Sequence, residues 1–302
     1  LGYGIGFGYA LAGLGTYLLI KRSWPWLLLV VVCYTLAIGV YQAFLPVLAA
    51  MFGISMIDAY IQSNSNFKLL LSKSISFIVV LLVSYVCYEL IKNWMISYWE
   101  TSFAQAYLSG FNKFELSKEY FDGAVVTSHE NLMKYYVGDK SIYLYELATL
   151  KVLMIATVSI AILRVIFFQK KIIAKFLSLI IGALVVFTPM AILMMNDGFM
   201  PQRTQLAVPV IIAGLCYLAA SVPIATLRAV ILCLASACIY KFCVVDNRFA
   251  FANDMQWQAD KVMTQQIING LVAVTDQLPE KSYHDAYPLE LVGVRYQTET
   301  AV

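Results

Sequence analysis

The chain has 302 residues, of which 61% are hydrophobic and only 13% are charged, and its mean hydropathy is +0.75. This composition leaves too little polar surface to cover a water-soluble protein of that length, so it excludes an ordinary soluble domain and indicates a protein embedded in a bilayer. The 21 Lys and Arg against 18 Asp and Glu give a net charge of only +3, so the positions of the charges carry more information than their sum.

Eight apolar stretches predict an all-α polytopic membrane helix bundle, because most of them approach the ~20 residues that a helix needs to cross hydrocarbon. The stretches are Gly2–Ile20, Pro25–Tyr41, Ala43–Ile57, Ile75–Met95, Ala148–Phe168, Ile172–Met195, Gln205–Ser221 and Pro223–Cys243. The second and third form one continuous run that could be a single kinked helix. We expect two helices that meet at residues 39–42, since a glycine and a polar amide suit a turn there.

The loops between these stretches divide by charge. One set carries Lys21, Arg22, Lys68, Lys73, Arg164, Lys170, Lys171, Lys175 and Arg228, with Asp58 as its only acidic residue. The positive-inside rule places that set in the cytoplasm and the opposite set on the outer side, which is the periplasm if the host is a Gram-negative bacterium. Leu1 then begins outside and is not an initiator Met, so we expect at least one helix and an outer loop upstream of it.

Two outer segments complete the predicted organisation, with a transmembrane domain over residues 1–245 and a periplasmic subdomain over residues 246–302. Within the first, residues 96–147 are rich in aromatics at spacings of three and four, which favours helices lying on the membrane surface over a saccharide-binding lid. In the second, Phe249–Val272 has the pattern of an amphipathic helix and Pro288–Val294 alternates like a strand, which predicts a small α/β tail.

Three polar groups at the predicted outer face are candidates for function. Tyr41 and Gln42 place a phenol and an amide at the outer end of two helices. Arg203 lies on the face that the positive-inside rule disfavours, where its guanidinium fork matches a phosphate, and Asp197 nearby could accept a proton or pair with it. Asp246 and Arg248 follow the last stretch, either as a helix cap with an interfacial ion pair or as a ligand contact.

Other polar residues point to simpler roles. Glu89 and Lys92 are most simply a partly buried pair. The six cysteines have no CxxC spacing and the two histidines lie far apart, so neither a zinc site nor a disulfide framework is predicted, and no ligand cluster indicates a divalent metal.

The chain resembles the integral-membrane O-antigen glucosyltransferases that convert serotype in Gram-negative bacteria and their phages. The residues that carry the resemblance are Leu36-Ala37-Ile38-Gly39-Val40-Tyr41-Gln42-Ala43, Pro201-Gln202-Arg203-Thr204, Asn247-Arg248-Phe249-Ala250-Phe251-Ala252-Asn253 with residues 256–260, and Leu291-Val292-Gly293.

The resemblance implies a GT-C type fold and the transfer of glucose, or a related hexose, from a polyprenyl-phosphate carrier to an O-antigen glycan at the periplasmic face of the inner membrane. It implies a lipid-linked sugar donor, a glycan acceptor and membrane lipid as partners, no nucleic acid and no certain cofactor. Arg203 is expected to bind the departing phosphate, with Tyr41 and Gln42 lining the donor pocket and Asp246 and Arg248 contacting substrate. The family is expected to use an acidic base in its first outer loop. We expect that loop to lie upstream of Leu1, and Asp197 is the candidate base within the given sequence.

Two other function classes remain open. A lipid-linked saccharide flippase or transporter would show internal repeats, and the two halves of the chain show no convincing self-similarity. A polymerase or ligase of the same saccharide pathway would share the topology and the arginines.

Overall fold

The computed structural model describes residues 2–21, 24–62, 66–99, 118–143, 146–169, 171–191 and 205–275. Within these ranges the chain is helical and has no strand, which confirms the predicted all-α polytopic class. The chain divides into two compact units, Leu1–Cys238 and Ile239–Val302. The expected domain boundary after residue 245 stays a prediction, and the strand expected at Pro288–Val294 lies outside the described residues.

Each of the eight apolar stretches forms a helix. These helices are α1 (Gly2–Lys21), α2 (Leu27–Val40), α3 (Phe44–Gln62), α4 (Phe67–Trp99), α8 (Ala148–Phe168), α9 (Ile172–Phe187), α11 (Ala207–Ala220) and α12 (Ala225–Thr275), and a short 3-10 turn, η1 (Trp24–Trp26), precedes α2. In the part of the chain that the structure describes, Phe44–Gln62, Phe67–Tyr98, Ala148–Phe167 and Ala225–Gly270 are long and apolar enough to cross a membrane. Leu27–Val40, Ile172–Phe187 and Ala207–Ala220 are shorter apolar helices.

Several helix ends differ from the sequence expectation. The helix α4 begins at Phe67, so Lys73 lies inside a helix and not in a loop, and α3 continues to Gln62 and includes Asp58. The helix α9 ends at Phe187, two residues before Pro189, whereas the apolar stretch continues to Met195. A proline disfavours helical geometry in the residue before it, which explains the early end.

The expected turn between α2 and α3 is present. Tyr41 is extended, with φ −167° and ψ 127°, and its N–H closes α2 on the carbonyl of Ala37. Pro46 is the third residue of α3, where a missing backbone N–H costs no helical hydrogen bond. The sequence prediction of two helices is therefore confirmed.

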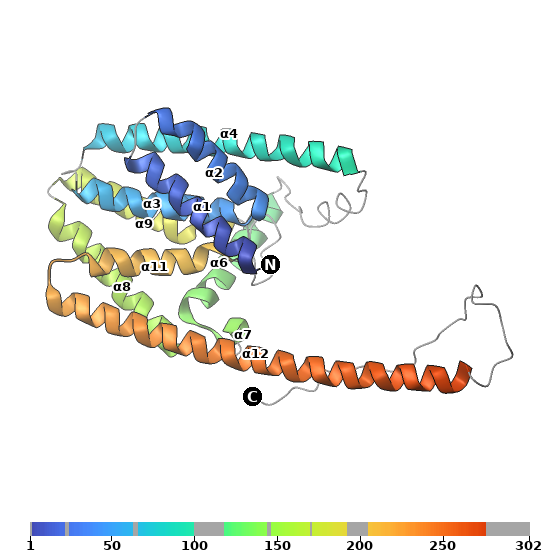
Figure 1. The fold of residues 1–302 in the computed structure, drawn as a ribbon. Coiled ribbons are helices and arrows are strands. Elements are labelled where there is room, and N and C mark those ends of the chain that lie inside the picture. Colours follow the sequence, from blue (N-terminus) through green and yellow to red (C-terminus); the bar gives the residue numbers. More distant parts are fainter. Residues whose placement is uncertain are drawn as a thin grey trace. The chain divides into compact units, whose positions relative to one another are not determined.

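Contacts between α1 and α2 show that these helices are antiparallel. The hydroxyls of Thr16 and Tyr34 are 3.1 Å apart, joining the late part of α1 to the middle of α2. A Cβ on Gly4 would lie 3.7 Å from Val40, so the start of α1 lies beside the end of α2. The two helices pass each other as consecutive membrane spans do (Figure 1).

Contacts between α3 and α11 show that those two helices are parallel. Gly214 lies against Ile54, and the phenol of Tyr217 donates to Asp58 at 2.9 Å, so residue numbers rise in the same direction along both helices. Parallel packing is what we expect of two helices that cross the membrane in the same direction.

These directions give unit 1 two distinct ends. We call one the basic end; it contains the last turns of α1, α3, α8 and α11 and the first turns of α4 and α9, with Lys21, Lys73, Arg164 and Lys171 among them. The other is the motif end, which contains the Tyr41–Gln42 turn and the start of α11 at Gln205–Leu206. The described basic residues of the loops that charge grouped together therefore lie at one end of unit 1.

The helix α3 is the central helix of unit 1. About two thirds of its most apolar window is buried, against about a fifth for α4. It packs against α1, α9 and α11, whereas α4 packs on α2 and exposes Ile78, Leu82 and Val86. Such exposed aliphatic side chains are expected where a helix faces lipid.

The described part of residues 96–147 forms α6 (Lys118–Val137) and α7 (Lys140–Tyr143). The helix α6 ends at Gly138, whose φ of +73° is the left-handed conformation that terminates helices. Packing of α6 against α8, together with a 2.7 Å hydrogen bond from the Tyr136 phenol to the Val186 carbonyl, fixes α6 at the motif end.

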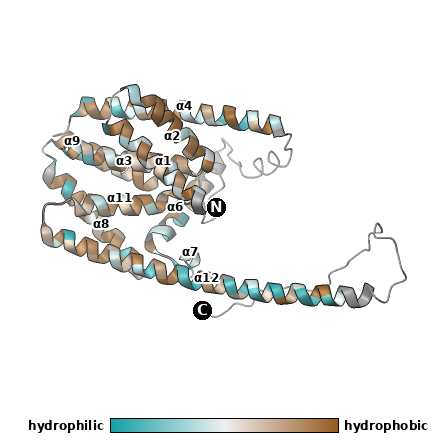
Figure 2. Ribbon diagram, viewed as in Figure 1, coloured by the Kyte–Doolittle hydropathy of each residue, from teal (hydrophilic) through white to brown (hydrophobic). Residues whose placement is uncertain are grey.

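The helix α12 runs without interruption from Ala225 to Thr275. Its first part belongs to unit 1, where Ile231 packs with Ile160 and Ala219, and its second part is much more polar (Figure 2). The expected amphipathic helix at Phe249–Val272 is present, but it continues the last span, and the helix cap considered at residues 246–248 is wrong because those residues lie inside the helix.

Candidate active site

The Tyr41–Gln42 turn presents polar groups at the motif end. The Gln42 side chain is exposed, and its amide nitrogen donates to the phenol oxygen of Tyr88 on α4 at 2.9 Å. Gly39 of α2 lies beside the Tyr88 ring, since a Cβ at that position would be 4.0 Å from it, an ordinary van der Waals contact. The turn is therefore braced by α4, a partner that the sequence did not indicate.

Charged groups lie beside this hydrogen bond. Lys92 forms an ion pair with Glu89 one turn earlier on α4, as the sequence predicted. The Lys92 ammonium also lies 5.6 Å from the centre of the Tyr88 ring, within the range of cation–π attraction. An amide, a phenol, an ammonium and a carboxylate thus gather in one place, which is a suitable set for hydrogen bonding to sugar hydroxyls.

The start of α11 is fixed at the same end. The phenol of Tyr9 on α1 donates to the Leu206 carbonyl at 2.7 Å, and its ring meets the buried Phe44 edge-to-face at 5.2 Å. Phe44 is the first residue of α3 and follows the Tyr41–Gln42 turn by two positions. One aromatic pair therefore ties together the starts of α3 and α11.

Gln205, immediately before Leu206, is 6% exposed, and its amide nitrogen has no hydrogen-bond partner among the described residues. An unsatisfied buried polar group costs about 1–3 kcal/mol, which a bound ligand would relieve. Gln205 directly follows the Pro201–Thr204 motif in the sequence.

The other candidate residues from the sequence lie partly outside the described ranges and partly in unit 2. Asp197 and Arg203 lie outside the described residues, so their roles stay predictions. Asp246 and Arg248 are exposed on α12 within unit 2. Tyr41 and Gln42 are the two candidates whose surroundings in unit 1 are described.

Aromatic residues of α6 and α7 serve as anchors. Tyr135 and Tyr136 are both 5% exposed, and the Tyr143 phenol donates to the Tyr135 carbonyl at 3.1 Å. Burial raises the pKa of all three phenols. Because the Tyr135 and Tyr136 rings are buried, they are not available as stacking surfaces for a sugar. The less favoured alternative, a saccharide-binding lid, finds no support in these residues.

A second polar cluster, at the basic end, was missed by the sequence. Arg164 on α8 donates to Asp58 on α3 at 2.8 Å and to the Leu218 carbonyl at 3.1 Å. Gln62 and Tyr217 donate to the other carboxylate oxygen at 2.6 and 2.9 Å. The signal that could have revealed it was an acidic residue among basic loops, which requires a partner to remain charged near a membrane.

No group of three or more His, Cys, Asp or Glu side chains that could hold a metal ion occurs in the described ranges. The polar groups around the Tyr41–Gln42 turn include the Gln42 amide, the Tyr88 phenol and the Glu89–Lys92 ion pair. This set suits binding of a hydroxyl-rich or phosphate-bearing ligand by hydrogen bonds.

The fold and the motif end define a polytopic helical membrane protein with a polar site at one end of its bundle. A family model described as "Glucosyl transferase GtrII" matches residues 3–219, and the chain belongs to that family of glucosyltransferases, which act in O-antigen modification. The match includes α1 to α11, with the Tyr41–Gln42 turn and the segment that holds Asp197 and Arg203. Comparison with curated proteins gave no match, and neither did comparison with solved structures.

Proposed function

We propose that this protein transfers glucose, or a related hexose, from a polyprenyl-phosphate carrier to an O-antigen glycan at the periplasmic face of the bacterial inner membrane. The motif end faces the periplasm in this proposal, because the opposite end holds the basic loops and the positive-inside rule assigns those to the cytoplasm. The C-terminus, after α12, is then periplasmic as well.

The observation that carries the proposal is that the Tyr41–Gln42 turn lies at the same end of unit 1 as the start of α11, the helix that follows the Pro201–Thr204 motif in the sequence. The Tyr41–Gln42 turn and the start of α11, which begins four residues after Arg203 in the sequence, are joined through Tyr9 and Phe44. A lipid-linked donor needs its sugar phosphate at the membrane surface while its polyprenyl tail stays in lipid. A polar site at the end of an apolar bundle meets that requirement.

Each candidate residue has a proposed task. Transfer requires a cation to stabilise the departing phosphate and a base to take the proton of the acceptor hydroxyl. We assign the first task to Arg203 and the second to Asp197, with Tyr41 and Gln42 contacting the donor sugar. Asp246 and Arg248 are proposed to contact the acceptor glycan.

The test is linkage analysis of lipopolysaccharide from cells that express the full-length protein, its Arg203→Ala variant, or neither. Lys151→Ala is the matched control, since Lys151 is exposed in the first turn of α8 at the motif end. We expect one new hexose branch with the parent protein and the control, and its loss with Arg203→Ala. An elongated ladder would instead indicate a polymerase, and identical glycans with folded protein would indicate transport; either result would overturn the proposal.

A second comparison separates sugar contact from bracing of the turn. Tyr88→Phe removes the acceptor of the Gln42 hydrogen bond but keeps the Gln42 amide, whereas Gln42→Ala removes the amide itself. If Gln42 contacts the donor, Gln42→Ala lowers transfer more than Tyr88→Phe does. Equal losses would show that the hydrogen bond only holds the turn.

A further inference from the structure

A pocket of about 280 Å³ opens at the basic end, between the last turns of α1 and α3 and the first turns of α4. It lies at the opposite end of α3 from the Tyr41–Gln42 turn, and the 19 residues of that helix span about 27 Å. The pocket is therefore separate from the proposed transfer site.

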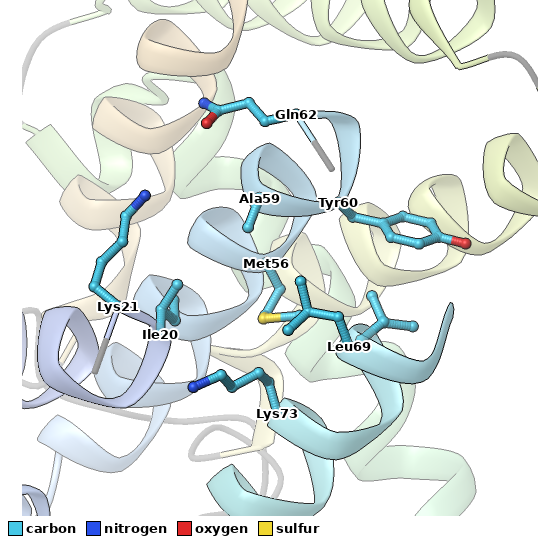
Figure 3. Close-up of a pocket in the computed structure, with 9 residues that line it drawn as sticks. Ile20, Lys21, Met56, Ala59, Tyr60, Gln62, Leu69 and Lys73 are labelled. Atoms are coloured by element: carbon cyan, nitrogen blue, oxygen red, sulfur yellow. The ribbon is translucent and has the colours of Figure 1, made fainter. Parts of the chain in front are cut away.

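Two lysines mark one side of the pocket. Figure 3 shows Lys21 from α1 and Lys73 from α4 on the same side, with Met56 and Leu69 across from them. No Asp or Glu is among the lining residues that the structure describes. Two ammonium groups without a carboxylate between them favour an anionic ligand.

The two lysines are held differently. Lys73 donates to the Leu19 carbonyl at 2.7 Å, which satisfies one of the last carbonyls of α1 and fixes the ammonium at the pocket. The ammonium keeps its positive charge in this bond, so it still attracts an anionic ligand. Lys21 is exposed and makes no hydrogen bond or ion pair within the described residues, so its ammonium can turn toward a ligand.

The other walls are apolar. Ile20, Met56, Ala59, Leu69 and Leu70 line the pocket together with the lysines. An apolar wall beside paired ammonium groups, at the end of membrane-spanning helices, matches a molecule with a charged head and a hydrocarbon body. A free phosphate ion would gain nothing from these aliphatic side chains.

We propose that this pocket binds the phosphate of an anionic membrane lipid, with Lys21 and Lys73 on the phosphate oxygens and Met56 and Leu69 against the adjoining hydrocarbon. Both anionic glycerophospholipids and polyprenyl phosphates carry this chemistry. The inference rests on the pocket alone and does not depend on the proposed transferase activity.

The test measures binding of a photoactivatable phosphatidylglycerol to the purified full-length protein in phosphatidylcholine nanodiscs. We expect labelling near Leu69–Lys73 and an affinity about fivefold lower in each of Lys21→Gln and Lys73→Gln, the loss expected for one lysine at a lipid surface. Lys171→Gln is the control; it removes the same charge at the start of α9, outside the pocket. An equal loss in the control would overturn the proposal, since it would show only general attraction to basic residues.

Competitors identify the ligand. Unlabelled phosphatidylglycerol or polyprenyl phosphate should displace the probe, and whichever acts at the lower concentration is the preferred lipid. Soluble glycerol phosphate competing equally well would overturn the proposal, because the apolar wall would then contribute nothing. Should Lys73→Gln fail to fold, since Lys73 also holds the end of α1, Lys21→Gln decides the outcome alone: unchanged binding in that variant contradicts the proposal.

Discussion

The guanidinium of Arg164 donates to the carboxylate of Asp58 across 106 residues of chain, and the two side chains are 8% and 12% exposed. The pair joins α8 to α3, and the hydrogen bonds from Tyr217 and to Leu218 add α11. Three helices that are distant in sequence therefore share one polar contact at the basic end.

Removing one member of this pair should destabilise the protein more than removing both. Arg164→Met leaves a buried carboxylate with its main counter-charge gone, and breaking such pairs costs about 3–5 kcal/mol. The double variant Asp58→Leu with Arg164→Met leaves no unpaired charge, so we expect it to recover much of that loss. Unfolding in mixed micelles with increasing SDS measures both; a double variant no more stable than Arg164→Met would contradict the prediction.

Gly8 should tolerate substitution poorly, whereas Gly13 on the same helix should tolerate it well. A Cβ on Gly8 would overlap the ring of Phe44, which is fully buried, while a Cβ on Gly13 meets nothing within 4 Å. Overpacking typically costs about 1–3 kcal/mol, and Ala in place of Gly inside a helix gains up to about 1 kcal/mol. We expect a lower unfolding midpoint for Gly8→Ala and an equal or higher one for Gly13→Ala. Similar midpoints in the two variants would refute the close packing of α1 on α3.

The Tyr136 phenol should determine how firmly α6 is held. Tyr136→Phe removes the hydrogen bond to the Val186 carbonyl, at a net cost of about 1 kcal/mol. Hydrogen exchange of backbone amides over Lys118–Val137 should then accelerate about fivefold. Val126→Ala serves as the control on the same helix because Val126 is 57% exposed. Unchanged exchange in Tyr136→Phe would show that packing against α8 alone holds α6.

The turn between α6 and α7 should weaken in acid. Hydrogen bonds from the Ser141 hydroxyl and from its backbone N–H lower the pKa of the Asp139 carboxyl below its ordinary value of 3.8. A lowered pKa in the folded state means that the carboxylate stabilises the turn at pH values above 3.8 and loses that effect as the pH falls through the folded pKa. The Ser141 amide, 2.8 Å from Asp139 Oδ1, should therefore lose protection from exchange at low pH. In Asp139→Asn that loss should be absent; if it persists, another group is responsible.

Helix positions were predictable because a run of apolar residues is enough to specify a membrane span. The Tyr41–Gln42 turn was predictable as well, since a polar amide within an otherwise apolar run has few other places to lie. The continuity of α12, in contrast, could not be predicted from the sequence. Asp246, Asn247 and Arg248 suggested an interruption, but exposed polar side chains do not stop a helix, and Ala225–Thr275 contains no proline and only Gly270 to weaken it.

Contacts between side chains that are far apart in the sequence were the hardest feature to predict. Nothing in the spacing of Asp58, Arg164 and Tyr217 indicates that they meet, because their contact depends on how α3, α8 and α11 pack. The same applies to Gln42 with Tyr88 and to the lysines of the basic-end pocket. The sequence was enough to predict which residue types lie at each end of the bundle. Which side chains contact one another there depends on how the helices pack.

The helix α3 meets its neighbours where glycines allow backbones to approach. Gly8 of α1 receives Phe44, Gly53 receives Val185 of α9, and Gly214 of α11 receives Ile54. Each contact sets one side chain against a position with none, so the two positions are constrained together in evolution. Among family members, a larger residue at any of these three glycine positions should therefore occur together with a smaller residue at the position that it contacts. Such paired substitutions would identify the helices that pack against α3.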